Sequence, residues 1–143
     1  MKGIRHTGIV VRDLNRAVAF YRDTFGFQPA SQDRETGPFI SALVGLDDVD
    51  VAWVKLTAPD GSMLELLQYH SHPDDAPHQP APSNKVANAH LALTVTDVDA
   101  LYQRFQELGL PTHGAPKTAP NGKARALYAH DPDGVILELV QEL

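Results

Sequence analysis

The chain contains the same strand-like phrase twice, and this repeat limits its possible folds more than any other feature of the sequence. PDGSMLELLQ occupies residues 59–68 and PDGVILELVQ occupies residues 132–141, with identical residues at seven of the ten positions. A repeat of this kind indicates a duplicated supersecondary unit. Each copy places a glutamate, Glu65 or Glu138, inside an apolar run. An unpaired charge is costly in a buried strand, so both glutamates need an explanation.

A second pair of segments extends the repeat toward the N-terminus of each half. HTGIVVRDLNRAVAFYRDTFGF begins at His6 and aligns with HLALTVTDVDALYQRFQELGL, which begins at His90. Both segments start as a strand and continue as an amphipathic helix. Asp13 and Asp97 stand where an N-cap carboxylate is expected, and a glycine stands where each helix should end. The two halves are therefore expected to share a strand and a helix.

Short β-type runs follow each predicted helix. They cover residues 49–57 and 62–69 in the first half, and residues 124–130 and 135–141 in the second. An Asp-Gly pair separates the two runs in each half, and this dipeptide is typical of hairpin turns. Each half is thus predicted to contain a strand, a helix and a small meander.

The first half carries an insertion of about eleven residues, because the histidines lie 84 positions apart and the glutamates only 73. PFISALVGL (38–46) is the expected insertion, and its apolar spacing favours a short helix, with a strand as the alternative. HSHPDDAPHQPAPSNK joins the halves, and its four prolines exclude a continuous helix or a central strand. We expect one domain over 1–143, with module one at 1–70, a linker at 71–86 and module two at 87–143.

Composition excludes several classes of function. A net charge of -6 and a pI near 5.5 provide no basic surface for nucleic acid or for an anionic membrane. The chain has no cysteine, so a bound metal must be held by His, Asp or Glu. No apolar run reaches the length of a membrane span, and the N-terminus does not resemble a signal peptide. We expect a cytoplasmic protein.

Two histidines and two glutamates occupy equivalent positions of the repeat: His6 with His90, and Glu65 with Glu138. A single strand histidine or glutamate usually points to solvent or is satisfied by one partner. Pseudo-twofold symmetry, however, could bring all four together. Two neutral imidazoles and two carboxylates suit one Zn, Ni, Co, Mn or Fe(II) ion and leave two octahedral positions open.

These phrases, in this order, resemble the vicinal oxygen chelate superfamily, which includes glyoxalase I, methylmalonyl-CoA epimerase, extradiol dioxygenases, and fosfomycin and bleomycin resistance proteins. The resemblance covers nearly the whole chain. It implies an α+β fold of two tandem βαβββ modules whose curved sheets form a cup around the metal. It also implies that His6, Glu65, His90 and Glu138 are the ligands, and that the protein is a homodimer.

The ligand set favours one group of reactions within this resemblance. Glyoxalase I and the epimerases use four side-chain ligands and abstract a proton beside a metal-chelated carbonyl, through an enediolate or enolate. The resemblance thus implies a lyase or isomerase that acts on a small-molecule carbonyl substrate. Glu138 or Glu65 would be the catalytic base, and we favour Glu138. Glutathione is not favoured as part of the substrate, because Val10 and Tyr69 replace the Arg and Asn that glutathione-dependent members usually carry.

Three alternatives stay open. An extradiol ring-cleaving dioxygenase would bind Fe(II) and leave the fourth-strand position without a ligand, but Glu65 occupies that position. A non-catalytic binding protein of the bleomycin resistance type would usually lack the ligands. A fosfomycin-type transferase would use three protein ligands and gather basic residues.

Other residues have a structural and a functional interpretation. His70, His72 and His78 could form a second metal cluster, but solvated side chains in the linker are favoured. Residues that could line the mouth of the cup, or pack at strand ends, are Tyr69, Tyr128 and His130. Residues that could meet an anionic group, or stay solvated, are Lys117, Lys123 and Arg125.

Overall fold

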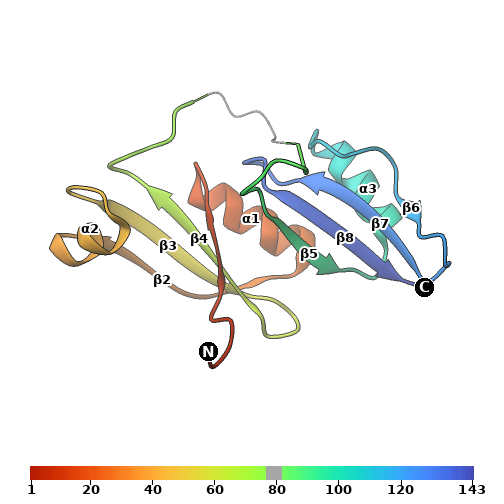
Figure 1. Cartoon of the computed structure of the whole chain (residues 1–143), viewed down its shortest axis with the longest axis horizontal. Helices are drawn as coiled ribbons and strands as arrows, with labels where there is room; N and C mark the ends of the chain where they lie inside the picture. The colour runs from red at the N-terminus through yellow and green to blue at the C-terminus, as the bar shows by residue number, and fades with distance from the viewer. Residues whose placement is uncertain (77–81) are drawn as a thin grey trace. The chain divides into compact units, whose positions relative to one another are not determined.

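The computed structural model describes residues 1–76 and 82–143, and the chain divides after Ala76 into two compact units. Each unit contains one four-stranded mixed sheet and one long helix, and apart from the short helix α2 of unit 1 the elements follow the same order in both (Figure 1). The predicted α+β class with two βαβββ modules is therefore confirmed.

Unit 1 carries the first sheet, in the strand order β1-β4-β3-β2. Strand β1 runs parallel to β4, and the other neighbours are antiparallel. Its elements are β1 (Thr7–Val10), α1 (Leu14–Phe25), β2 (Gln28–Thr36), α2 (Pro38–Val44), β3 (Asp50–Thr57) and β4 (Met63–Tyr69).

Unit 2 repeats this arrangement, with the order β5-β8-β7-β6 and with β5 parallel to β8. The predicted Asp-Gly turns join β3 to β4 and β7 to β8. Gly61 and Gly134 take φ values of 87° and 86°, which glycine tolerates without a steric cost. The elements of unit 2 are β5 (His90–Thr94), α3 (Val98–Glu107), β6 (Lys117–Thr118), β7 (Ala124–His130) and β8 (Ile136–Glu142).

Both long helices begin with the predicted aspartate and with a second cap that sequence reasoning did not find. The Asp13 carboxylate accepts a hydrogen bond from Arg16 N at 2.9 Å, and the Asp97 carboxylate accepts one from Ala100 N at 2.9 Å. In α1, Leu14 N also donates to the side-chain oxygen of Gln68 at 2.9 Å. These bonds satisfy N–H groups that have no partner inside a helix.

The second cap recurs in α3, where Val98 N donates to the side-chain oxygen of Gln141 at 3.0 Å. Gln68 and Gln141 are the last residues of the two repeated decamers. Through this glutamine, strand β4 therefore holds the start of α1, and strand β8 holds the start of α3. Helix α1 ends as predicted, with Gly26 as its left-handed C-cap at a φ of 76°. In α3 the C-cap is Leu108 in the right-handed region, and the left-handed Gly109, at a φ of 65°, follows it.

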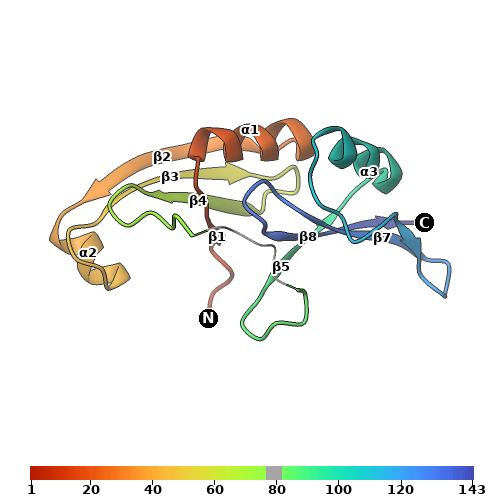
Figure 2. The same ribbon diagram turned by 90° about the horizontal axis from the view of Figure 1, so that it is seen from above.

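The core of each unit lies between the long helix and one face of the sheet. Figure 2 shows α1 lying along the sheet of unit 1. Ala17, Phe20 and Tyr21 of α1 are buried, as are Val54 and Leu56 of β3 and Leu64 and Leu66 of β4. Unit 2 buries Val98 and Phe105 of α3 with Leu127, Ala129, Leu137 and Leu139 of its sheet. The opposite face of each sheet is left for other side chains, including both glutamates.

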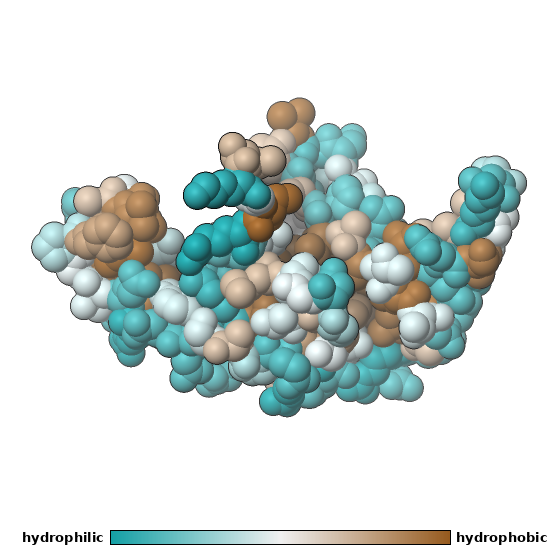
Figure 3. Space-filling view, turned by 90° about the horizontal axis from the view of Figure 1, so that it is seen from below, coloured by the Kyte–Doolittle hydropathy of each residue, from teal (hydrophilic) through white to brown (hydrophobic). Residues whose placement is uncertain are grey.

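Helix α2 (Pro38–Val44) confirms the helical interpretation of residues 38–46 and has no counterpart among residues 82–143. Its Ile40 packs with Val49 and Val51, and the partly buried Leu67 and Tyr69 join this cluster. Val51 and Leu67 lie on the same face of the sheet as Glu65, so α2 covers one end of that face. Apolar residues also gather on the outer surface over α2 (Figure 3), where Phe39 and Leu43 are 74% and 68% exposed.

Two strands were missed from the sequence, β2 and β6. Strand β2 lies at the edge of its sheet, and eight of its nine residues are exposed. It therefore lacks the alternation of apolar and polar residues that marks a half-buried strand. Strand β6 has only two residues.

Of the helices in the described ranges, none combines the length and the apolar character that crossing a bilayer requires.

Candidate functional site

The first predicted pair lies on unit 1, where the imidazole of His6 meets the carboxylate of Glu65. His6 comes directly before β1, and Glu65 lies in the middle of β4. The distance between His6 Nε2 and Glu65 Oε2 is 3.0 Å. The Glu65 side chain is only 12% exposed, so this carboxylate requires partners.

The second pair lies on unit 2 and has the same geometry. The distance between His90 Nε2 and Glu138 Oε2 is again 3.0 Å. This carboxylate is more accessible, because the Glu138 side chain is 28% exposed.

Strand register explains why the two pairs match. In unit 1 the parallel ladder sets Gly8 opposite Glu65, and in unit 2 it sets Ala92 opposite Glu138. Each of these residues follows its histidine by two positions, and residues two apart on a strand share a face. The histidine therefore projects on the same side as the glutamate in both units.

The pairs fit the chemistry of a divalent cation. Adjacent ligands of an octahedral ion, each about 2.1 Å from it, are separated by about 3.0 Å. That separation matches the nitrogen-to-oxygen distance in both units, which is also the length of an ordinary hydrogen bond between the two groups. His6 Nδ1 is buried and has no hydrogen-bond partner, so only Nε2 of this imidazole is engaged. Imidazole and carboxylate are also the ligand types that borderline and hard divalent metals accept.

The two pairs belong to different units, and the combination of all four residues in one centre stays a prediction. Over residues 1–76 and 82–143, no group of three or more metal-binding side chains converges on one point. Each pair by itself supplies one imidazole nitrogen and one carboxylate.

A third side chain contacts each glutamate, and here the two units differ. Lys55 Nζ lies 3.3 Å from Glu65 Oε1 in unit 1. At the equivalent position of unit 2, cross-strand pairing sets the Tyr128 phenol opposite Glu138. Burial of this ring, together with the charge of Glu138 and the hydrogen bond to it, raises the pKa of the Tyr128 phenol. Glu65 thus faces a cation, whereas Glu138 faces a neutral donor.

The spacing of residues around each hairpin turn indicates these neighbours. The turn residues Asp60 and Asp133 lie at the centres of the two hairpins. Lys55 and Glu65 each stand five residues from Asp60, and the same spacing relates Tyr128 and Glu138 to Asp133. Residues placed symmetrically about a hairpin turn become cross-strand partners, as the ladders show here.

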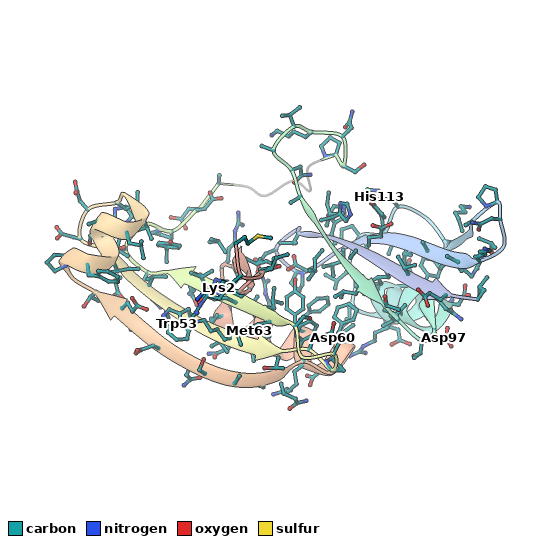
Figure 4. All side chains as sticks on the ribbon, turned by 60° about the horizontal axis from the view of Figure 1, so that its bottom comes forward. Lys2, Trp53, Asp60, Met63, Asp97 and His113 are labelled. Carbon is teal, nitrogen blue, oxygen red and sulfur yellow. The ribbon has the colours of Figure 1, made fainter. Side chains whose placement is uncertain are left out.

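Tyr128 also belongs to a line of aromatic and histidine rings in unit 2. Its ring centroid lies 5.5 Å from that of His90 and 6.0 Å from that of His113. His113 is labelled in Figure 4. His113 Nε2 lies 2.9 Å from His130 Nε2, and His130 Nδ1 lies 3.0 Å from the carbonyl oxygen of Gly134. His130 is 2% exposed, so it is a packed, hydrogen-bonded residue.

The structure shows where several residues lie for which the sequence allowed both a structural and a functional interpretation. Tyr69 packs against the Ile40 cluster at the end of β4. His70 and His72 are exposed, which agrees with the solvated interpretation, whereas His78 lies outside the described residues. Arg125 pairs with Asp99 of α3 at 2.7 Å and therefore lies on the helix side of its sheet, away from Glu138.

The chain is similar to known proteins over nearly its whole length. Residues 3–139 match the family model described as the Glyoxalase/Bleomycin resistance protein/Dioxygenase superfamily. The uncharacterized protein YwbC of Bacillus subtilis is 30% identical over 142 residues, which cover 98% of each chain. A 2-epi-5-epi-valiolone epimerase from Actinomyces is 32% identical over 96% of this chain and 78% of its own length.

Two further similarities extend this comparison. A lactoylglutathione lyase of Pseudomonas aeruginosa is 28% identical over 95% of this chain and 80% of its own length. Among solved structures, a glyoxalase family protein from Bacillus cereus superposes with a TM-score of 0.90 at 26% identity. That alignment covers 100% of this chain and 95% of the other.

Proposed function

The chain belongs to the glyoxalase/bleomycin resistance protein/dioxygenase superfamily, and we propose that it is a divalent-metal-dependent lyase or isomerase. In this proposal His6, Glu65, His90 and Glu138 hold one Zn, Ni, Co or Mn ion. The enzyme removes a proton beside a carbonyl group of a small-molecule substrate and proceeds through an enediolate or enolate.

The duplicated His–Glu pair is the observation that carries this proposal. Each unit sets an imidazole nitrogen and a carboxylate oxygen 3.0 Å apart by the same strand register. A structural ion pair would explain one such contact. Its repetition at equivalent positions of both units favours a role that requires both pairs. A metal bound there would act as a Lewis acid and lower the energy of the negative charge that develops on the carbonyl oxygen.

Glu138 is the better candidate for the base. A base must take up a proton and give it back, so its carboxylate must be free to change charge. Glu65 is 12% exposed and is ion-paired to Lys55, so a proton on it would leave that ammonium without its partner. Glu138 is 28% exposed and faces the neutral phenol of Tyr128, so it can be neutralised without leaving a buried cation unpaired.

Two relatives support the reaction class. The Actinomyces relative is an epimerase and the Pseudomonas relative is a lactoylglutathione lyase. In this chain Val10 and Tyr69 stand where glutathione-dependent members usually carry Arg and Asn. We therefore favour a carbonyl substrate without glutathione. We also propose, from the family resemblance, that the protein is a homodimer and that it acts in the cytoplasm.

Elemental analysis of the purified protein tests the metal assignment before any substrate is known. We expect about one Zn, Ni, Co or Mn ion per chain, and its loss in a His6→Ala, Glu138→Ala double variant. His70→Ala is a matched control, because His70 is an exposed histidine outside both pairs. Iron at the same level would favour an extradiol dioxygenase instead. A protein that takes up no metal, even after reconstitution, would contradict the proposal and favour a binding protein.

A further inference from the structure

Strand β3 carries a lysine on the same face as Glu65. Cross-strand pairing sets Lys55 opposite Glu65, and the two side chains are 18% and 12% exposed. Glu65 is held from both sides, with His6 Nε2 at 3.0 Å from one oxygen and Lys55 Nζ at 3.3 Å from the other. A cation this close to a predicted metal ligand is unexpected, because it would stand beside a second positive charge when metal is bound.

An aromatic ring holds the ammonium group in this position. Lys55 Nζ lies 4.2 Å from the centroid of the Trp53 ring, within the range of a cation–π interaction. The indole N–H of Trp53 donates to the carboxylate of Glu35 at 2.6 Å, so the ring is itself fixed. Trp53 is labelled on β3 in Figure 4. Lys55 therefore packs against the Trp53 ring rather than extending into solvent.

The balance of charge indicates what the lysine could bind. Two carboxylates would neutralise a divalent cation held by both pairs. In unit 1, however, Lys55 already neutralises Glu65. In unit 2 the equivalent residue is the neutral Tyr128, which removes no charge from Glu138. A loaded centre would thus retain one positive charge, and it lies on the Lys55 side.

We propose that Lys55 determines substrate specificity by binding an anionic oxygen, and that the substrates are carbonyl compounds with a carboxylate beside the reacting carbonyl. The proposal rests on the proposed function, because it assumes the metal centre. In the free protein Lys55 pairs with Glu65, and in the complex its ammonium group pairs with the substrate carboxylate. A single ammonium offers one point charge to an anionic oxygen, without the bidentate geometry of a guanidinium.

A pair of small probes tests this assignment. Pyruvate and hydroxyacetone share a methyl ketone, but only pyruvate carries a carboxylate. We would titrate the Mn(II)-loaded protein with each compound and follow binding by calorimetry and by the fluorescence of Trp53, the only tryptophan of the chain. We expect pyruvate to bind more tightly than hydroxyacetone. Inorganic phosphate, titrated separately, distinguishes a carboxylate site from a general anion site.

Variants of Lys55 then separate a specificity role from a structural one. Lys55→Met keeps the apolar stem and removes the charge. At saturating Mn(II) we expect it to weaken pyruvate binding by about tenfold or more, while hydroxyacetone binding stays unchanged. Lys55→Arg should retain the preference for pyruvate. Lys55→Gln provides a second neutral variant if the methionine variant does not fold. Lys123→Met is the control, because Lys123 is exposed in a loop.

The outcomes distinguish the two proposals. If the wild-type protein takes up Mn(II) but Lys55→Met and Lys55→Gln keep the preference for pyruvate, the role of Lys55 is wrong and the metal centre stands. The same conclusion follows if the loaded protein does not bind pyruvate, or binds phosphate and pyruvate equally well. If the wild-type protein takes up no Mn(II), both proposals fail together.

Discussion

The two units carry the same His–Glu pair but surround it differently. In unit 1 the glutamate contacts Lys55 and is 12% exposed, whereas in unit 2 the glutamate contacts Tyr128 and is 28% exposed. Strand register maintains the pair in both units, because His and Glu are set by the same parallel ladder. The residue opposite the glutamate does not affect that ladder. Duplication can therefore preserve a ligand pair while each copy acquires a different neighbour.

Helix α2 is a second difference between the units. It inserts Ile40 against Val49 and Val51 and so covers part of the face that carries Glu65. In unit 2 the loop before β6 brings His113 to Tyr128 and His130 instead. Unit 1 thus has a cluster of apolar side chains around Ile40 on the face that carries its His–Glu pair, whereas unit 2 has the rings of Tyr128, His113 and His130.

The largest expected effect concerns the two glutamates. If only Glu138 transfers the proton, Glu138→Gln should lower turnover by about 10²- to 10⁴-fold and keep most of the metal. Glu65→Gln should mainly weaken metal binding. Deuterium exchange at the α-position of a panel of carbonyl compounds measures proton transfer, and elemental analysis measures the metal. Equal loss of exchange in both variants at saturating metal would contradict the division of roles.

Substitutions in the two hydrophobic cores should have a smaller effect, and this effect is on the free energy of unfolding. Leu66 and Leu139 are fully buried at equivalent positions of β4 and β8. Replacing either with alanine should lower the free energy of unfolding of its own unit by about 2–5 kcal/mol, because the cavity that remains loses contacts. Trp53 fluorescence reports unit 1 in a urea titration, and far-UV circular dichroism reports the whole chain. An unchanged Trp53 transition in Leu66→Ala would contradict the assignment of this core.

The two glutamine caps should contribute less to the free energy of unfolding than the buried leucines do, and their two contributions should be equal. Gln68→Ala and Gln141→Ala each leave one helix N–H without its acceptor, and each should cost about 1 kcal/mol of stability. Gln103→Ala is the control, because Gln103 is exposed within α3. Urea unfolding measures all three variants. A cost in one cap variant but not in the other would show that the second cap of the repeat is not equivalent in the two units.

The smallest expected effect is a pH dependence in unit 2. The hydrogen bond from Arg125 lowers the pKa of Asp99 below its ordinary value of 3.8. The unfolded chain therefore binds more protons here, so the contribution of this pair is present above pH 3.8 and is lost as the pH falls through the lower folded value. Asp99→Asn should lower the urea midpoint slightly at pH 7, where the pair is intact, and this difference from the wild type should shrink as the pH falls below 3.8. An unaltered pH profile in this variant would contradict the assignment.

Much of the fold followed from the sequence because the chain is duplicated. The aligned aspartates, the glycines and the Asp-Gly turns predicted the two long helices and the two main hairpins. Strand β2 was missed, because an exposed edge strand lacks the alternation on which such predictions depend. The caps at Gln68 and Gln141 were also missed, because a glutamine at the end of a strand has no local signature of a helix cap.

For the candidate site, the sequence by itself determined the residue types and their equivalence: one histidine and one glutamate in each half, at positions related by the repeat. Only the tertiary structure decided which groups meet them. It set Lys55 and Tyr128 against the glutamates, turned Arg125 toward Asp99, and packed Tyr69 under α2. Side chains alternate between the two faces of a strand, so the neighbours of a residue depend on the register of the adjacent strand and on the elements that cover each face.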